Sequence, residues 1–81
     1  MQPDAPANLT LEEHRELARE LRATRARVKE LSNLVAAIYG RGNGAAASFL
    51  KAAEAVDRLC QEMQEQALHD LPGFHIDGLY R

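Results

Sequence analysis

The sequence predicts an all-α fold, an antiparallel two-helix hairpin of coiled-coil type that dimerises into a four-helix bundle. Two observations predict the hairpin. Apolar residues recur at alternating steps of four and three along two segments, which is the spacing of a coiled-coil seam. A turn with three glycines, Gly40, Gly42 and Gly44, separates these segments, and the residue numbers of facing seam positions add to a constant across it. Folding the chain back at this turn therefore brings the two seams together.

The predicted hairpin occupies residues 10–71, after a disordered N-terminal arm at residues 1–9. The arm carries Pro3 and Pro6 among small and polar residues and shows no periodicity. Thr10 then opens a helix of about residues 10–39, because its hydroxyl and the carboxylate of Glu13 have the spacing of a capping box. The seam of this helix, including a polar first position, reads His14, Leu17, Leu21, Thr24, Val28, Leu31, Val35 and Ile38.

The glycine-rich turn at residues 40–44 ends the first helix, because glycine enters left-handed backbone conformations at little cost. Asn43 or Gly44 begins the second helix, which covers about residues 45–70. The sequence Leu71-Pro72-Gly73 stops it, since proline cannot continue the helical hydrogen bonds. Its seam reads Ala46, Phe49, Ala53, Val56, Cys60, Met63 and Ala67, and Asp70 follows as the last position.

Small residues of the second seam face mostly large residues of the first. Every seventh position of the second helix is small, and Ala46, Ala53, Cys60 and Ala67 are paired by the register with Ile38, Leu31, Thr24 and Leu17. Such pairing lets two helices approach closely without leaving voids. The same register pairs His14 with Asp70 and brings Arg25 near Asp57.

The bulk composition excludes several classes of protein. A formal net charge of -2 in 81 residues lacks the basic excess of a dedicated nucleic-acid or membrane-surface protein. The single cysteine forms no internal disulfide, and no His, Cys and acidic spacing predicts a metal site or another cofactor. The N-terminus lacks a signal-peptide pattern and no apolar run is long enough to span a membrane. We therefore expect a cytoplasmic protein without a cofactor.

Apolar residues outside the seam predict association with a second copy. Leu34, Ala52 and Leu59 lie on one flank of the seam, and the second helix carries further leucines elsewhere. A two-helix hairpin cannot cover all of these, and small monomers seldom leave a large apolar patch in water. We expect the flank to form a homodimer interface.

Neither titratable candidate predicts catalysis. The His14–Asp70 layer has the residue types of a general base or metal ligand, but a polar layer at the frayed open end of the hairpin is the favoured interpretation. No nucleophile or oxyanion donor is placed beside it, so we expect a protein that is not an enzyme. Cys60 is interpreted as a small buried apolar residue, since its charged neighbours Asp57 and Glu62 are acidic.

A stripe of basic residues on the first helix offers an alternative function. Arg15, Arg19, Arg22 and Lys29 could bind an anion or follow a nucleic-acid backbone. Glutamates interleave with the stripe and no aromatic residue accompanies it for base stacking, so nucleic acid is the less favoured partner.

The C-terminal tail, residues 72–81, is richer in apolar groups than a disordered segment. It carries Phe74, Ile76, Leu79 and Tyr80. Two alternatives remain open, because the tail can fold back over the hairpin or dock on a partner. The sequence as a whole predicts a non-enzymatic protein–protein interaction module, a small dimeric regulator or adaptor that binds itself and an unidentified protein through the flank or the tail.

Overall fold

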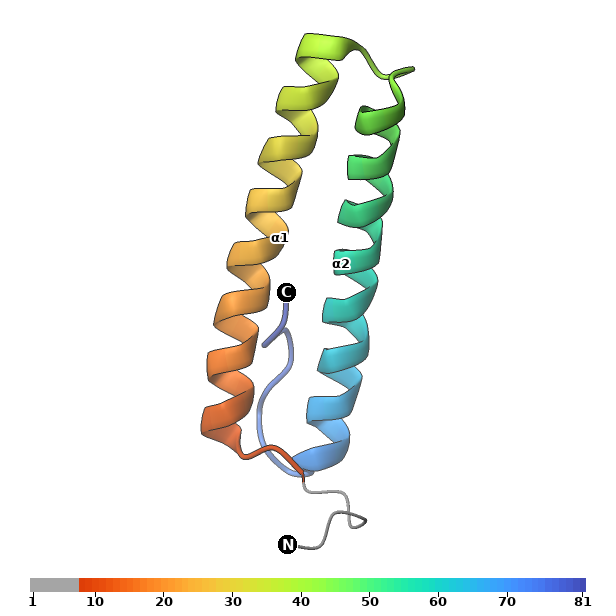
Figure 1. Cartoon of the computed structure of the whole chain (residues 1–81). Coiled ribbons are helices and arrows are strands. Elements are labelled where there is room, and N and C mark those ends of the chain that lie inside the picture. The colour runs from red at the N-terminus through yellow and green to blue at the C-terminus, as the bar shows by residue number, and fades with distance from the viewer. Residues whose placement is uncertain (1–7) are drawn as a thin grey trace, which may run out of the picture.

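A computed structural model describes residues 8–81 and shows two long helices packed antiparallel (Figure 1). Helix α1 spans Leu11–Tyr39 and helix α2 spans Gly44–Asp70. The predicted hairpin is confirmed, and the helix limits agree with those expected from the sequence within about one residue. Most of the predicted N-terminal arm falls on residues 1–7, which lie outside the described residues. Within residues 8–81, neither helix is long and apolar enough to cross a bilayer.

Both helices begin at the residues whose side chains can satisfy free backbone amides. The Thr10 hydroxyl accepts from the Glu13 amide at 3.1 Å, and the Glu13 carboxylate accepts from the Thr10 amide at 2.8 Å. This confirms the predicted capping box. At α2 the Asn43 side-chain oxygen accepts from the amides of Ala45 and Ala46 at 2.8 and 3.2 Å. Each cap pairs donors that the first turn of a helix leaves without partners.

The turn between the helices depends on one glycine with a left-handed backbone. Gly40 has a φ of 89°, and its amide donates to the Ala36 carbonyl at 2.8 Å. A side chain at this φ would be strained, so glycine is needed here. Helix α2 ends where the Leu71 amide donates to the Ala67 carbonyl at 2.9 Å, just before Pro72.

The small residues of the α2 seam form the centre of the helix pair. Ala46, Ala53, Cys60 and Ala67 are all buried, as the register predicts. On α1, however, only His14 and Ala18 are buried. The leucine and valine residues of the α1 seam are half-buried. The prediction that every seam position lies in the core is wrong at two residues, because Thr24 is exposed and Ile38 is 63 % exposed.

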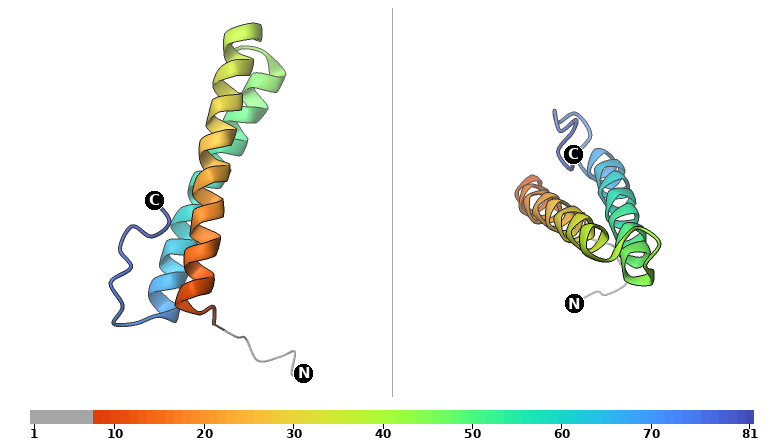
Figure 2. Two further views of the ribbon diagram at one scale, coloured as in Figure 1. Left: turned by 90° about the vertical axis from the view of Figure 1, so that its left-hand side faces the viewer. Right: turned by 90° about the horizontal axis from the view of Figure 1, so that it is seen from above.

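The tail explains the difference at Thr24. Residues 71–81 fold back along one side of the hairpin (Figure 2), and the buried side chains of Ile76 and Tyr80 join a core cluster with Ala18, Cys60 and Ala67. Cys60 therefore packs in a cluster with Ala18 and Tyr80 instead of facing Thr24. The inward face of α1 is turned toward the tail, which leaves Thr24 in solvent and half-buries its neighbour Arg25.

Ile38 is exposed because it lies at the turn end, beyond the reach of the tail. Seen from above, the helices meet at the turn and diverge toward the open end, where the tail lies beside them (Figure 2). Of the two alternatives for the tail, the structure shows the fold-back.

Candidate functional site

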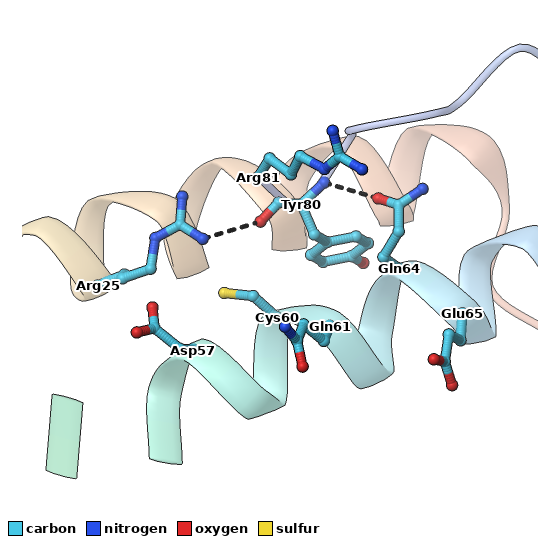
Figure 3. A pocket seen from close by; sticks show the side chains of 8 residues that line it. All are labelled: Arg25, Asp57, Cys60, Gln61, Gln64, Glu65, Tyr80 and Arg81. Atoms are coloured by element: carbon cyan, nitrogen blue, oxygen red, sulfur yellow. Dashed lines mark hydrogen bonds between the residues drawn. The ribbon is translucent and has the colours of Figure 1, made fainter. Parts of the chain in front are cut away.

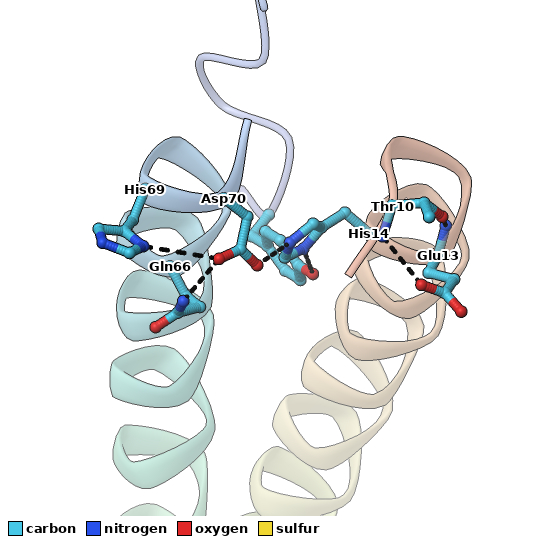
Figure 4. A network of polar contacts seen from close by, with 7 residues as sticks. Thr10, Glu13, His14, Gln66, His69 and Asp70 are labelled. Carbon is cyan, nitrogen blue, oxygen red and sulfur yellow. Dashed lines mark hydrogen bonds and ion pairs between the residues drawn. The ribbon is translucent and has the colours of Figure 1, made fainter. Parts of the chain in front are cut away.

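A buried polar network joins the two helices and the tail at the open end of the hairpin (Figure 4). The imidazole Nε2 of His14, on α1, lies 2.9 Å from Asp70 Oδ2 at the end of α2. Its Nδ1 lies 2.8 Å from the hydroxyl of Tyr80 in the tail. The His14 and Asp70 side chains are 0 and 2 % exposed, and Tyr80 is 1 % exposed. Three segments far apart in sequence therefore share one imidazole.

Additional contacts fix the carboxylate of this network. Gln66 Nε2 donates to Asp70 Oδ1 at 2.8 Å, and the ring of His69 lies 3.6 Å from the same oxygen. The hydrogen bond from His14 holds the pKa of Asp70 below its usual value, helped by Gln66 against the opposing effect of burial. Burial raises the pKa of the Tyr80 hydroxyl, helped by the nearby charge of Asp70. Asp70 is thus a stable carboxylate acceptor, and Tyr80 a stable neutral hydroxyl.

The sequence located two of these three residues. The predicted pairing of His14 with Asp70 is confirmed, but the layer is buried, whereas a frayed, water-tolerant end was expected. The reason is Tyr80, which covers the ring edge-on with 5.9 Å between ring centroids. The signal available in the sequence was the apolar and aromatic content of the tail, which predicted docking without giving its register.

Side chains of both helices bind the backbone of the tail. Gln64 acts at two points, because its Nε2 donates to the Ile76 carbonyl at 2.8 Å and its Oε1 accepts from the Tyr80 amide at 2.9 Å. From α1, Arg22 donates to the Leu79 carbonyl at 3.1 Å and Arg25 to the Tyr80 carbonyl at 3.4 Å. These four bonds hold a segment that has no regular secondary structure of its own.

A pocket of about 620 Å³ opens beside the end of the tail (Figure 3). Arg25 and Asp57 both line it, close to Tyr80. Arg25 was expected near Asp57, but Asp57 pairs with Lys29, with 3.5 Å between their charged atoms. Arg25 instead donates to the tail backbone. Docking of the tail therefore provides Arg25 with a different partner from Asp57.

The residues of the basic stripe all have partners within the chain. Arg15 pairs with Glu12 at 3.4 Å, and Arg19 pairs closely with Glu16. As described above, Arg22 binds the tail and Lys29 binds Asp57. Exposed pairs of this kind contribute about 0–1 kcal/mol each, but they also neutralise the charge that an anion would meet.

The predicted flank lies on the side of the hairpin turned away from the tail. Leu34 is nine residues from Arg25, and Leu59 is nine residues from both Leu50 and Leu68. Nine residues make about 2.5 helical turns, so each pair points to opposite sides of its helix. Arg25 binds the tail and Leu50 lines grooves with Ser32 on that same side. Leu34 and Leu59, 53 and 42 % exposed, therefore face away from it, together with the exposed Ala52.

The predicted tail residues differ in exposure. Ile76 and Tyr80 are buried against the chain's own helices, Leu79 is half-buried, and Phe74 is 52 % exposed. Of these four residues, Phe74 alone leaves most of its side chain in solvent.

The described residues bring together no metal-binding set of three or more His, Cys, Asp or Glu side chains. Comparison of the chain with protein-family models, curated proteins and solved structures finds no match. The molecule is thus a helical hairpin with a docked tail, a closed polar network on one side and an apolar flank on the other.

Proposed function

We propose that this chain is a non-enzymatic protein–protein interaction module that acts as a homodimer, with Leu34, Ala52 and Leu59 in the interface. Two hairpins joined along this flank would form a four-helix bundle, in which each copy covers the other's half-buried seam. The module is of a size suited to a small regulator or adaptor. The free thiol of Cys60 supports a reducing, cytoplasmic location for it.

One observation carries the proposal. In residues 8–81, the buried apolar side chains of the two helices are the small ones alone, namely Ala18, Ala46, Ala53, Cys60 and Ala67. The large buried apolar residues, Ile76 and Tyr80, both come from the tail and lie on its side of the hairpin. Leucine, valine and methionine in the seam are only half-buried, and completing their burial would add a part of the roughly 1.5–3 kcal/mol that burial from full exposure is worth for each side chain. A second copy on the flank would supply this burial.

The tail and the basic stripe are the less supported surfaces. Ile76 and Tyr80 already pack against the chain's own helices, whereas Leu34 and Leu59 of the flank are 53 and 42 % exposed. Nucleic acid remains the alternative partner, and the pairing of the stripe with Glu12, Glu16, Asp57 and the tail argues against it.

The oligomeric state tests the proposal with a matched pair of double variants. Leu34→Glu with Leu59→Glu places charges on the flank, whereas Leu50→Glu with Leu68→Glu places them on the opposite side at similar exposure, 55 and 44 %. Light scattering should give a dimer for the parent chain and for the control, and a monomer for the flank variant. If the dimer has a micromolar Kd, the parent chain should be almost fully dimeric at about 100 μM. A parent chain that is monomeric at that concentration, or two double variants that dissociate equally, would contradict the proposed dimer.

A further inference from the structure

The buried network of His14, Asp70 and Tyr80 contains an imidazole that can take up a proton, and this imidazole contacts the tail. Its three members come from α1, α2 and the tail, and none of them is used by the apolar flank. Two of the three keep their protonation state near neutral pH. The pKa of Asp70 is lowered and that of Tyr80 is raised, so neither titrates between pH 5 and pH 7.5. Imidazoles are the groups that exchange protons in this range.

The hydrogens of the network match its contacts only when the imidazole is neutral. In that state Nε2–H donates to the Asp70 carboxylate and the Tyr80 hydroxyl donates to Nδ1, so two hydrogens serve two contacts. A proton added at Nδ1 makes both ring nitrogens donors. The hydroxyl must then accept from Nδ1 and turn its own hydrogen away, although Tyr80 is 1 % exposed. Its contact with His14 is the only hydrogen bond that the hydroxyl makes to the described residues.

We propose that His14 is a proton-operated latch, which holds the tail when its imidazole is neutral and loosens the tail when it is protonated. The two contacts of the ring respond in opposite ways. The positive ring is attracted to Asp70, so the contact between the helices persists. The contact with Tyr80 leaves a buried donor without an acceptor, which costs the full desolvation of that donor. Acid therefore undocks the tail and leaves the hairpin folded.

Other ionisable groups around the ring do not reverse this expectation. From α2, Asp70 faces Nε2, and the exposed His69 lies behind it at 3.6 Å from the far oxygen of Asp70. Also from α2, Cys60 lies in the core cluster next to Tyr80. From the tail, Tyr80 faces Nδ1. On α1, the charged neighbours Glu13 and Arg15 are exposed and hydrogen-bonded to Thr10 and Glu12.

Release of the tail would change two surfaces at once. The segment with Ile76 and Tyr80 would become free to contact a partner, and the cluster with Ala18, Cys60 and Ala67 beneath it would open. The two alternatives that the sequence left open for the tail, folding back on the hairpin or docking on a partner, then correspond to the neutral and the protonated states of His14. This inference does not depend on the homodimer, since it concerns the opposite side of the hairpin.

Amide hydrogen exchange measured by NMR tests the latch on the full chain. The amide of Tyr80 donates to the Gln64 side chain on α2, a bond that exists only while the tail is docked, and the amide of Leu79 closes a turn to Ile76 within the docked segment. Relative to intrinsic exchange at the same pH, their protection should fall about tenfold from pH 7.5 to pH 5. Amides within α1 and α2, such as those of Val28 and Ala53, should keep their protection.

Variants separate the latch from other acid effects. His14→Gln removes the ring that takes up the proton but keeps a side-chain donor and acceptor at this position, so its tail should show equal protection at both pH values. His69→Gln and His75→Gln remove the other two imidazoles and should respond as the parent chain does. The proposal is overturned if the parent tail keeps or gains protection at pH 5, or if His14→Gln shows the same fall.

Discussion

His14 shows how a buried polar side chain can be accommodated in a chain with a very small core. A buried polar group without partners destabilises a fold, whereas one that is fully hydrogen-bonded specifies a single arrangement. Each ring nitrogen has one partner, and no buried side-chain N or O atom of residues 8–81 lacks one. The network therefore fixes both the register of the two helices and the position at which the tail docks.

Asp70 should make the chain sensitive to strong acid. Its folded pKa is lower than its unfolded pKa, so its contribution to stability is present above about pH 4 and is lost as the pH falls through the folded value. Urea unfolding between pH 5 and pH 2 should show stability falling with pH. Asp70→Asn should flatten that fall, and Asp77→Asn, which changes an exposed carboxylate of the tail, should leave it as it is. Equal slopes in all three chains would show that Asp70 is not the source.

At the scale of elements, the sequence predicted what local chemistry determines. The capping box of Thr10 and Glu13 and the Asn43 cap involve residues two or three positions apart; the box was predicted at these residues, and Asn43 was one of the two residues expected to begin the second helix. The burial of Ala18 and the exposure of Thr24 depend on Tyr80, which is more than fifty positions away in the sequence. The heptad periodicity does not predict where Tyr80 binds. The heptad pattern alone treats the hairpin as two helices, and a third segment on one side rotates the buried face.

The tail should depend on Gln64 more than on any neighbouring polar residue. Gln64→Ala removes both of its bonds to the tail backbone and should lower the free energy of unfolding by about 1–2 kcal/mol, since each net hydrogen bond contributes about 1 kcal/mol. Gln61→Ala is a matched control, because Gln61 is exposed in the same pocket and on the same helix. Chemical denaturation followed by circular dichroism would measure both, and equal losses would show that the two bonds do not hold the tail.

The whole molecule has two unlike sides. One is covered by the tail, whose backbone is bound by Gln64, Arg22 and Arg25. The other presents the exposed side chains of Leu34 and Leu59 beside the half-buried seam. The sequence predicted the second side from composition, because apolar residues exceeded what two helices can cover. It could not show which side the tail would take, and this choice leaves the flank free.

Thermal stability should therefore depend on protein concentration. If two hairpins share the flank, folding and association are coupled, and raising the concentration hundredfold should raise the Tm by roughly 5–10 °C for a dimer of this size. The Leu34→Glu and Leu59→Glu double variant should melt at one lower temperature whatever its concentration, because a monomer has no association term. The Leu50→Glu and Leu68→Glu control should follow the parent chain. Scanning calorimetry over that range would decide, and a parent Tm independent of concentration would mean that the hairpin and its docked tail are stable alone.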